Sequence, residues 1–200
     1  MKLYDLIKGI ARTELPDIEI TALTSDNRVE IPQGAMFVCI KGKTFDGHSA
    51  ARQMSNKGAA VIVAEHDLGL ENQIIVSDTR SIYPKLCAAW FGNPEKQLKL
   101  IGVTGTNGKT TITTVLKKVL TDFRCKTGLI GTCQNEIGSE VIPTSRTTPE
   151  PYDLFELFRK MADAGCEYVV MEVSSQGLEQ KRVEGCRFKV GVFTYLTQDH

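Results

Sequence analysis

The stretch that decides the fold runs from residue 98 to residue 111 and reads LKLIGVTGTNGKTT. Its apolar start predicts a strand over residues 98–104, and the apolar spacing after it predicts a helix over residues 109–123. Glycines between them let successive backbone N–H groups face an anion, and the helix N-terminus adds partial positive charge. A strand, a glycine-rich loop and a helix in this order predict a phosphate-binding loop.

The same stretch contains the residues that are expected to bind ATP. The Lys109 side chain is expected to reach the β and γ phosphates, and the Thr110 hydroxyl is expected to ligate Mg²⁺. The strict pattern G-x-x-x-x-G-K-[ST] fails by one residue, because Val103 stands at the first glycine position and Gly102 comes one residue early. The alternative is a tight turn that binds nothing, but it leaves a Gly-Lys-Thr-Thr helix start unexplained. The predicted ATP contacts are Gly105, Thr106, Asn107, Gly108, Lys109, Thr110 and Thr111.

Strands and helices alternate beyond this loop. Further strands are expected at 126–130, 168–173 and 189–195, with a helix at 149–164. Strands that alternate with helices of this length predict an α/β domain whose mainly parallel sheet is covered on both faces.

The N-terminal half is expected to be a smaller α/β domain. Helices are predicted at 2–11, 47–57 and 79–91, and short strands at 19–23, 35–40, 59–64 and 73–76. Gly92-Asn93-Pro94 stops the last helix, and the polar residues Glu95-Lys96-Gln97 follow. We therefore expect one domain over residues 1–94 and a second over residues 98–200.

Composition excludes several classes of function. The 200 residues hold 24 basic and 24 acidic side chains, so no net charge draws the chain to nucleic acid or to an anionic membrane. A hydrophobic content of 42% supports a folded core. No apolar run approaches the roughly 18 residues of a membrane span, and the N-terminus lacks a signal-peptide pattern. The expected location is the cytoplasm.

The six cysteines are scattered and form no C-x-x-C pair. This spacing predicts neither a zinc knuckle nor a disulfide framework. We expect reduced cysteines that are mostly small buried residues.

Several motifs resemble one known family. The stretch TGTNGKTT (104–111) resembles the ATP loop of the Mur ligase superfamily, which includes the folylpolyglutamate synthases. TTPE (147–150), MEVSSQGL (171–178) with Arg182 beyond it, and LTQDH (196–200) are similar to the MurE-type branch of UDP-N-acetylmuramoyl-L-alanyl-D-glutamate:amino-acid ligases. DNR (26–28), PQGAMFV (32–38) and residues 42–48 resemble the uridine-binding domain of that branch. The resemblance spans essentially the whole chain.

This resemblance implies a fold and an activity. The implied fold is a small N-terminal α/β uridine-binding domain followed by a phosphate-loop-type parallel-sheet central domain, incomplete at residue 200. The implied reaction is ATP-dependent ligation of a diamino acid to UDP-MurNAc-L-Ala-D-Glu through an acyl phosphate, with ATP and Mg²⁺, in peptidoglycan precursor synthesis. Because chains of this family continue further, we expect an N-terminal portion with little or no ligation by itself.

The implied catalytic residues are Lys109, Glu172 and His200, and the implied metal ligands are Thr110, Glu172 and His200. Glu172 also has support from position, since it follows a predicted strand and ligands of parallel sheets bind at the carboxyl ends of the strands. A hard carboxylate oxygen there suits Mg²⁺. The alternative is an ordinary surface glutamate at a strand end. The role of His200 is implied by the resemblance alone.

The resemblance also implies substrate contacts in both domains. Contacts to the muramoyl peptide would be Thr147, Thr148, Ser174, Gln180 and Arg182, and contacts to uridine would be Ser25, Asn27, Lys43, Thr44 and Phe45. Thr147 and Thr148 can instead be a simple helix start before Pro149. The chain departs from the family pattern at Asn27, Arg146 and Gln176.

Two other functions stay open. One is a nucleotide or UDP-sugar binding module without chemistry. The other is a ligase of the folylpolyglutamate synthase type, which is disfavoured because those enzymes lack this N-terminal domain and the EVSS-x-GL motif. The sequence does not determine which amino acid is added.

Overall fold

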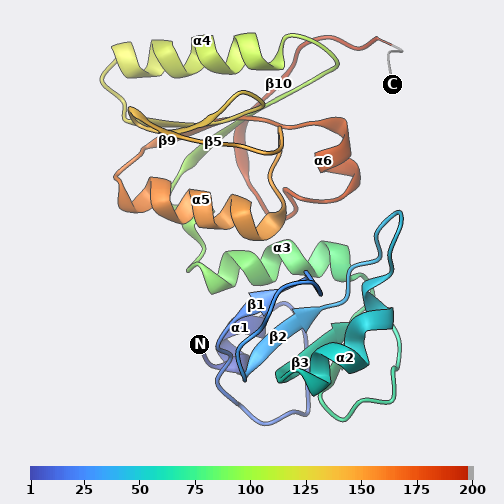
Figure 1. Cartoon of the computed structure of the whole chain (residues 1–200). Coiled ribbons are helices and arrows are strands. Elements are labelled where there is room, and N and C mark those ends of the chain that lie inside the picture. Colours follow the sequence, from blue (N-terminus) through green and yellow to red (C-terminus); the bar gives the residue numbers. More distant parts are fainter. Residues whose placement is uncertain (198–200) are drawn as a thin grey trace. The chain divides into compact units, whose positions relative to one another are not determined.

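The computed structural model describes residues 1–197 and divides the chain into two compact units, Met1–Trp90 and Phe91–His200 (Figure 1). Each unit contains a sheet with parallel strands together with helices. The mixed α/β class predicted from the sequence is therefore confirmed.

The first unit is built on a four-stranded sheet in the order β1-β2-β3-β4, and every neighbouring pair is parallel. Its strands are β1 (Leu23–Thr24), β2 (Ala35–Val38), β3 (Ala59–Ala64) and β4 (Gln73–Ile75). Its helices are α1 (Leu3–Ile7), the 3₁₀ turn η1 (Gly47–Ala50), α2 (Ala51–Asn56) and α3 (Thr79–Trp90). The carboxyl ends of all four strands therefore meet at one edge of the sheet.

Three elements of this unit differ from expectation. The first helix ends at Ile7 instead of residue 11, because Gly9 adopts a left-handed φ of 70° soon after it. The strand expected over 19–23 shrinks to β1, since the backbone N–H of Ile20 donates to Met1 instead of continuing a ladder. The helix expected over 47–57 begins as η1, whose first turn is capped by the Asp46 side chain.

Apolar side chains of alternating strand positions form the core of this unit. Phe37 of β2 and Ile62 and Ala64 of β3 pack in one buried cluster with Ala51 and Met54 of α2. Because side chains alternate across a strand, this packing fixes the register of the sheet. The loops that follow the strands are then held at a defined edge.

The second unit contains a six-stranded sheet in the order β10-β5-β9-β6-β7-β8. The first four strands of this order are parallel, whereas β7 and β8 pair antiparallel at one side. The strands are β5 (Lys99–Thr104), β6 (Thr127–Ile130), β7 (Asn135–Ile137), β8 (Glu140–Ile142), β9 (Tyr168–Glu172) and β10 (Phe188–Phe193). The helices are the 3₁₀ turn η2 (Pro94–Lys96), α4 (Lys109–Asp122), α5 (Pro151–Asp163) and α6 (Ser175–Glu179). The predicted mainly parallel sheet is confirmed.

Helices cover both faces of this sheet. Figure 1 shows α4 and α5 on opposite sides of strands β5 and β9. Ile112, Leu116 and Leu120 of α4 pack on a buried cluster that includes Val103 and Val170. On the α5 side, a Cβ added to Gly128 of β6 would lie 2.6 Å from the Met161 sulfur, so glycine here lets Met161 pack directly on the strand. Helix packing on both faces leaves the strand ends as the open edge of the sheet.

The β7–β8 hairpin, α6 and the 3₁₀ turn η2 of the second unit were missed. The β7–β8 hairpin turns through Gly138 and Ser139, with a φ of 62° at Gly138, as two-residue hairpin turns favour. The Gly-Ser pair between two short apolar segments is a hairpin signal that the sequence carried. The short helix α6 is capped by Ser174, whose hydroxyl oxygen accepts from the Gly177 N–H.

Two further expectations concern cysteines and membranes. All six cysteines are free, but only Cys39, Cys87 and Cys166 are buried, so the expectation of mostly buried cysteines is half correct. Burial raises the pKa of the Cys39 thiol to about 12, which keeps it protonated and unreactive. Within residues 1–197, no helix is long and apolar enough to cross a membrane.

Candidate functional site at the carboxyl ends of the strands

The glycine-rich loop of residues 105–108 joins β5 to the N-terminus of α4. Gly105 and Gly108 both have positive φ angles, 132° and 85°. A Cβ at Gly105 would overlap the Thr194 hydroxyl and lie 2.8 Å from the Tyr195 carbonyl oxygen. Glycine is therefore required at Gly105 both by the backbone conformation and by the close approach of the chain after β10.

Hydrogen bonds from the segment after β10 hold this loop in shape. The Thr194 hydroxyl donates to the Asn107 carbonyl at 2.5 Å, and the Thr106 N–H donates to the Tyr195 carbonyl at 2.7 Å. The Thr197 N–H donates to the Thr106 hydroxyl at 3.0 Å. The loop is thus braced by the neighbouring strand end rather than by its own sequence alone.

Lys109 is the first residue of α4 and is half-buried. Its ammonium group donates to the carbonyl oxygens of Gly105 at 2.6 Å and Thr106 at 3.1 Å. Thr110 follows on the same helix turn, and Thr111 is exposed. A phosphate anion at the loop would replace the two carbonyl oxygens as the acceptor of the Lys109 ammonium. This exchange is favourable because a hydrogen bond between two opposite charges is stronger than one to a neutral carbonyl.

Glu172 ends strand β9, the neighbour of β5 in the sheet, and only 1% of it is exposed. Its carboxylate accepts from the Thr110 hydroxyl at 3.1 Å, from the Thr132 N–H at 2.9 Å and from the Thr132 hydroxyl at 3.0 Å. A Cβ at Gly131 would lie 2.6 Å from the carboxylate, so a glycine makes room for it. Glu172 is therefore a buried, hydrogen-bonded group and not an ordinary surface glutamate.

The predicted metal ligands were Thr110, Glu172 and His200. The structure brings the first two together, and their hydroxyl and carboxylate oxygens are hard donors of the kind that Mg²⁺ prefers. His200 lies outside the described residues. Among residues 1–197, no group of three or more His, Cys, Asp and Glu side chains is arranged to hold a metal. The donor chemistry at Thr110 and Glu172 fits Mg²⁺ as a partial ligand set.

The predicted peptide contacts cluster around the end of β9. The Thr148 hydroxyl donates to the Glu172 carbonyl at 3.1 Å and accepts from the Ser174 N–H at 2.9 Å. The Arg182 guanidinium, 3% exposed, donates to the Thr148 carbonyl at 2.6 Å and to the Gln180 side-chain oxygen at 2.7 Å. The predicted peptide contacts Thr148, Ser174, Gln180 and Arg182 thus form one network with Glu172.

Charge in this network is balanced by Glu150, a residue of the TTPE motif to which the sequence assigned no role. The Glu150 carboxylate lies 2.9 Å from the buried Arg182 guanidinium and 3.0 Å from the exposed Arg146 guanidinium. Arg146, one of the departures from the family pattern, therefore forms an ion pair with a carboxylate four residues later. Thr132 was also missed, although its place two residues after the end of strand β6 put it at the same edge as Glu172.

The predicted uridine contacts lie at the matching edge of the first unit. Ser25 and Asn27 follow β1, and the exposed residues Lys43, Thr44 and Phe45 follow β2, which pairs with β1 in parallel. The Asp26 carboxylate accepts two hydrogen bonds from the Arg28 guanidinium, which lower its pKa. The structure therefore places both groups of residues at the carboxyl ends of adjacent strands.

His48 anchors the loop that carries Lys43, Thr44 and Phe45, and sequence reasoning assigned it no role. Its Nδ1 lies 2.6 Å from the Asp46 carboxylate, and its Nε2 accepts from the Glu65 N–H at 3.1 Å. Because the amide only donates, the ring proton is on Nδ1 and faces Asp46. The hydrogen bond from His48 lowers the pKa of Asp46.

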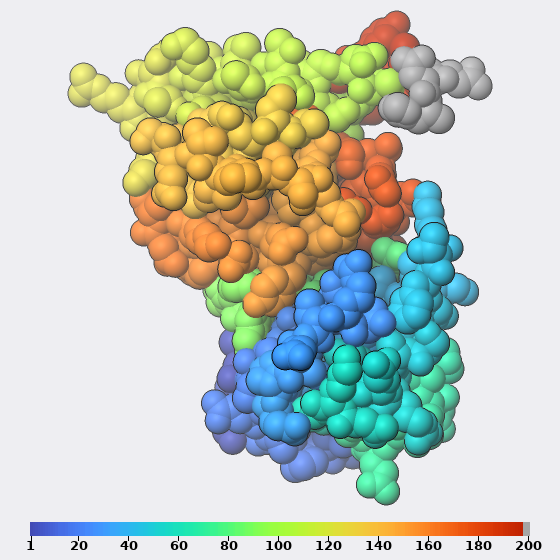
Figure 2. Space-filling view, viewed as in Figure 1, coloured from blue at the N-terminus to red at the C-terminus, as the bar shows by residue number. Residues whose placement is uncertain are grey.

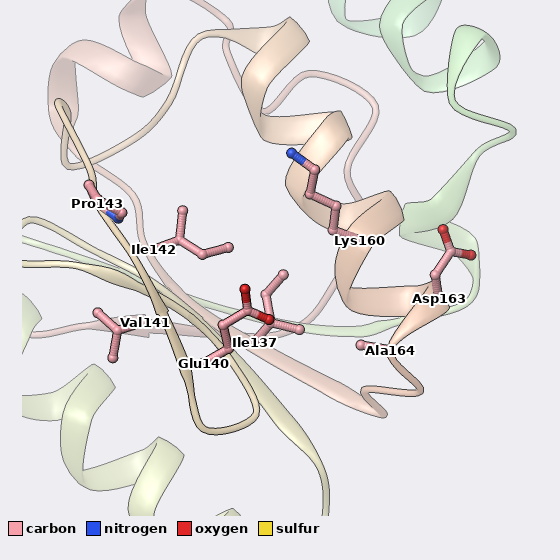
Figure 3. A pocket seen from close by; sticks show the side chains of 8 residues that line it. All are labelled: Ile137, Glu140, Val141, Ile142, Pro143, Lys160, Asp163 and Ala164. Atoms are coloured by element: carbon pink, nitrogen blue, oxygen red, sulfur yellow. The ribbon is translucent and has the colours of Figure 1, made fainter.

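An open hollow of about 610 Å³ lies away from these residues (Figure 3). It is lined by Ile137, Glu140, Val141, Ile142, Pro143, Lys160, Asp163 and Ala164, from the β7–β8 hairpin and the C-terminal half of α5. Neither Lys109 nor Glu172 lines this hollow. The chemistry-bearing residues therefore lie at the strand ends and not in this hollow.

A glycine-rich loop between a parallel strand and a helix, with a buried carboxylate at the end of the adjacent strand, defines a phosphate-loop-type α/β domain. A model of the "Mur ligase family, catalytic domain" matches residues 19–91, and a model of the "Mur ligase middle domain" matches residues 103–200. The chain belongs to the Mur ligase family, which confirms the resemblance seen in its sequence.

Individual relatives agree with this assignment. The UDP-N-acetylmuramoyl-L-alanyl-D-glutamate--2,6-diaminopimelate ligase of Clostridium perfringens is 46% identical over 200 residues, which cover 98% of this chain and 40% of that protein. The chain thus spans about two fifths of the length of this relative. A solved structure of a ligase with the same name has a TM-score of 0.81 at 23% identity, over 100% of this chain and 41% of the other. The MurF ligase of Thermotoga maritima in complex with ADP has a TM-score of 0.50 at 25% identity, over 77% and 32%.

Proposed function

We propose that this chain supplies the uridine-binding and ATP-binding parts of a ligase that adds a diamino acid to UDP-MurNAc-L-Ala-D-Glu in peptidoglycan precursor synthesis. The observation that carries the proposal is the hydrogen bond between the Thr110 hydroxyl and the buried Glu172 carboxylate. It joins the helix that begins with Lys109 to the end of the adjacent strand, at the edge where parallel sheets bind ligands.

The proposed reaction has two steps. In the first, an oxygen of the D-glutamate γ-carboxylate attacks the γ-phosphorus of ATP, and the bond to the β-phosphate oxygen breaks to release ADP. In the second, the amine nitrogen of the diamino acid attacks the acyl carbon, phosphate leaves with the oxygen that it received, and the nitrogen loses a proton. The products are the amide, ADP and phosphate.

Lys109 and the glycine-rich loop are the groups that bind the phosphates in this proposal. The backbone N–H groups at the start of α4 and the Lys109 ammonium face the γ-phosphate and offset the charge that develops on its oxygens. The two carbonyl contacts of Lys109 in this structure are weaker partners than a phosphate anion. Bound Mg²⁺ would supply further charge neutralisation. The Thr110 hydroxyl and the Glu172 carboxylate would hold it together with His200.

The acceptor substrate is proposed to lie along the same edges. Thr147, Thr148, Ser174, Gln180 and Arg182 would orient the muramoyl peptide so that its γ-carboxylate lies in line with the transferred phosphorus. Ser25, Asn27, Lys43, Thr44 and Phe45 would bind the uridine end. Because Arg182 is buried and already bonded to Glu150, we propose that it orients Thr148 and Gln180 as well as the substrate.

The substrates and the nucleotide named for similar proteins support this proposal. The Clostridium perfringens relative is a ligase for UDP-N-acetylmuramoyl-L-alanyl-D-glutamate and 2,6-diaminopimelate, and the Thermotoga maritima neighbour was solved with ADP. We therefore propose diaminopimelate as the first diamino acid to test. Because the chain spans about two fifths of the length of this relative, we expect binding of ADP and of the UDP precursor with little or no ligation by the chain itself.

The test supplies ATP, Mg²⁺, UDP-MurNAc-L-Ala-D-Glu and a panel of diamino acids, and it measures ligand binding, phosphate release and tripeptide product. Binding of ADP and of the UDP precursor without turnover is the expected result. Turnover by this chain would contradict its proposed inactivity by itself. Failure to bind the UDP precursor would overturn the uridine assignment, and failure to bind ADP would overturn the ATP assignment.

A further inference from the structure

Thr132 lies between the proposed metal ligand Glu172 and the proposed peptide contact Thr147. It follows strand β6, whose residue Ile130 pairs with Met171 in β9, so Thr132 lies beside Glu172. Its N–H donates to one carboxylate oxygen of Glu172 at 2.9 Å, and its hydroxyl donates to the other at 3.0 Å. The same hydroxyl lies 2.9 Å from the Thr147 hydroxyl.

Counting protons gives these hydroxyl contacts a direction. A carboxylate only accepts hydrogen bonds, so the Thr110 and Thr132 hydroxyls both donate to Glu172. A hydroxyl carries one proton, so Thr132 has none left for Thr147 and must accept from it. The series of hydrogen bonds therefore runs from the Thr147 hydroxyl through the Thr132 hydroxyl to the Glu172 carboxylate. In such a series each hydrogen bond polarises the next.

Thr132 and Thr147 also close the base of the β7–β8 hairpin, residues 133–146. The hairpin is tied to α4 by the ion pair between Lys117 and Glu136, whose side chains are 17% and 15% exposed. In Figure 2, the gold atoms of the hairpin lie at the surface between the yellow-green atoms of α4 and the orange atoms of α5. A braced hairpin keeps the two threonines in place at its base.

We propose that Thr132 is a positioning residue that orients the Glu172 carboxylate for the cation and couples it to the segment of Thr147 and Thr148. This proposal rests on the proposed function, because that function assigns the cation to Glu172 and the peptide to Thr147 and Thr148. Thr132 acts through Glu172 and contacts neither phosphate nor sugar in this role. Residues that orient a metal ligand typically change metal affinity by about 10- to 100-fold when they are substituted.

The experiment compares Thr132→Val with Thr132→Ser in the full chain. Valine keeps the branched shape and the N–H but removes the hydroxyl, which leaves Glu172 with one donor fewer and Thr147 without its acceptor. ADP affinity is measured by calorimetry in EDTA and over a series of Mg²⁺ concentrations. For Thr132→Val we expect the Mg²⁺ concentration at half-maximal effect to rise about 10-fold, with ADP affinity in EDTA unchanged. Thr132→Ser keeps the hydroxyl and should restore wild-type behaviour.

Thr144→Val is the matched control, because the Thr144 hydroxyl donates within the same hairpin, to the Arg146 carbonyl at 2.9 Å. It should leave the Mg²⁺ dependence unchanged. The double variant Thr132→Val/Thr147→Val should match Thr132→Val alone, since both substitutions interrupt one chain of hydrogen bonds. Thermal unfolding of each variant shows that it is folded, and Thr132→Ala replaces Thr132→Val if valine prevents folding.

Several results would overturn the proposal. A wild-type Mg²⁺ dependence in Thr132→Val, or a defect in Thr132→Ser equal to that of valine, would show that the hydroxyl orients nothing. A weakened ADP affinity in EDTA would show a general effect on the loop. If the unsubstituted chain binds no ADP, the proposed function fails and this inference fails with it, whereas Mg²⁺-dependent binding that Thr132→Val leaves intact refutes the inference alone.

Discussion

The two units place polar residues at the carboxyl ends of parallel strands, but they hold those residues in different ways. In the second unit, Glu172 is 1% exposed and three donors from Thr110 and Thr132 fix its carboxylate. In the first unit, Lys43 and Thr44 are exposed at a turn in which the Gly42 N–H donates to the Phe45 carbonyl, and Asp46 and His48 anchor the base of their loop. One edge holds a buried carboxylate that is already hydrogen-bonded, whereas the other presents exposed side chains on a surface turn.

This difference suits the two proposed tasks. Phosphoryl transfer depends on positioning and on preorganised charge, and a displacement of about 1 Å is costly. Recognition of a distant uridine tolerates a surface loop, because the loop only has to hold the substrate. We therefore expect substitutions in the second unit to affect the chemistry, and substitutions in the first to affect substrate affinity.

The largest expected effect follows from Lys109→Met, which removes the ammonium group and keeps the length of the side chain. We expect ADP affinity in the presence of Mg²⁺ to fall by about 10- to 100-fold, because a charge-assisted hydrogen bond to phosphate is lost. Binding of the UDP precursor should not change. Calorimetric titration measures both ligands, and Lys118→Met, on the exposed side of the same helix, is the control. An equal loss of affinity for ADP and for the UDP precursor would contradict the assignment of the two ligands to different units.

A smaller effect is expected for His48→Ala in the first unit. The substitution leaves the Glu65 N–H and the Asp46 carboxylate without the imidazole, at a cost of about 1–3 kcal/mol in stability. With its base untied, the loop should bind the UDP precursor about fivefold more weakly, since ordering it then costs entropy. ADP affinity should not change. The control is His66→Ala, which removes only the ring that stacks on His48 at 4.8 Å. Unchanged precursor affinity in His48→Ala would contradict the anchoring role.

The smallest effects are expected from pH, and they have opposite signs in the two units. The hydrogen bond from His48 lowers the pKa of Asp46, so its contribution to stability is present above its unfolded pKa near 3.8 and is lost as pH falls further. Burial raises the pKa of Glu95 above 4.5, so stability is highest below that value and is lost as pH rises through the raised pKa.

Asp46→Asn should flatten the acid side of the stability profile, and Glu95→Gln should raise the unfolding temperature near neutral pH by ~2 °C. Scanning calorimetry between pH 3 and pH 8 checks both variants. Loss of the acid slope in Glu95→Gln, or no change on the neutral side, would contradict the assignment of these signs.

Local sequence predicted the strands and helices that carry the phosphate loop. The strand expected over 98–104 differs from β5 by one residue, and the helix expected over 109–123 differs from α4 by one residue. These elements were predictable because a buried strand needs a short apolar run, and an amphipathic helix needs an apolar stripe. The glycine positions of the loop were equally visible, because Gly105 and Gly108 adopt positive φ angles that favour glycine.

The partners of the site residues were not predictable in this way. Nothing local to Thr132 says that its hydroxyl meets a carboxylate 40 residues later in the sequence. The same holds for His48 and the Glu65 N–H, and for Arg182 and Glu150. Each of these contacts depends on which strands lie next to each other, and strand order follows from packing over the whole sheet.

The sequence by itself determined the alternation of strands and helices, the glycine-rich loop that opens α4, and the membership of the Mur ligase family. Periodicity and backbone freedom are properties of neighbouring residues, and motifs are read in order along the chain. Only the tertiary structure decided that Glu172 is buried, that Thr110 and Thr132 hold its carboxylate, and that Thr147 donates to Thr132. The physical reason is that β5, β9 and β6 are neighbours in the sheet but not in the sequence, so their carboxyl ends meet only when the sheet forms.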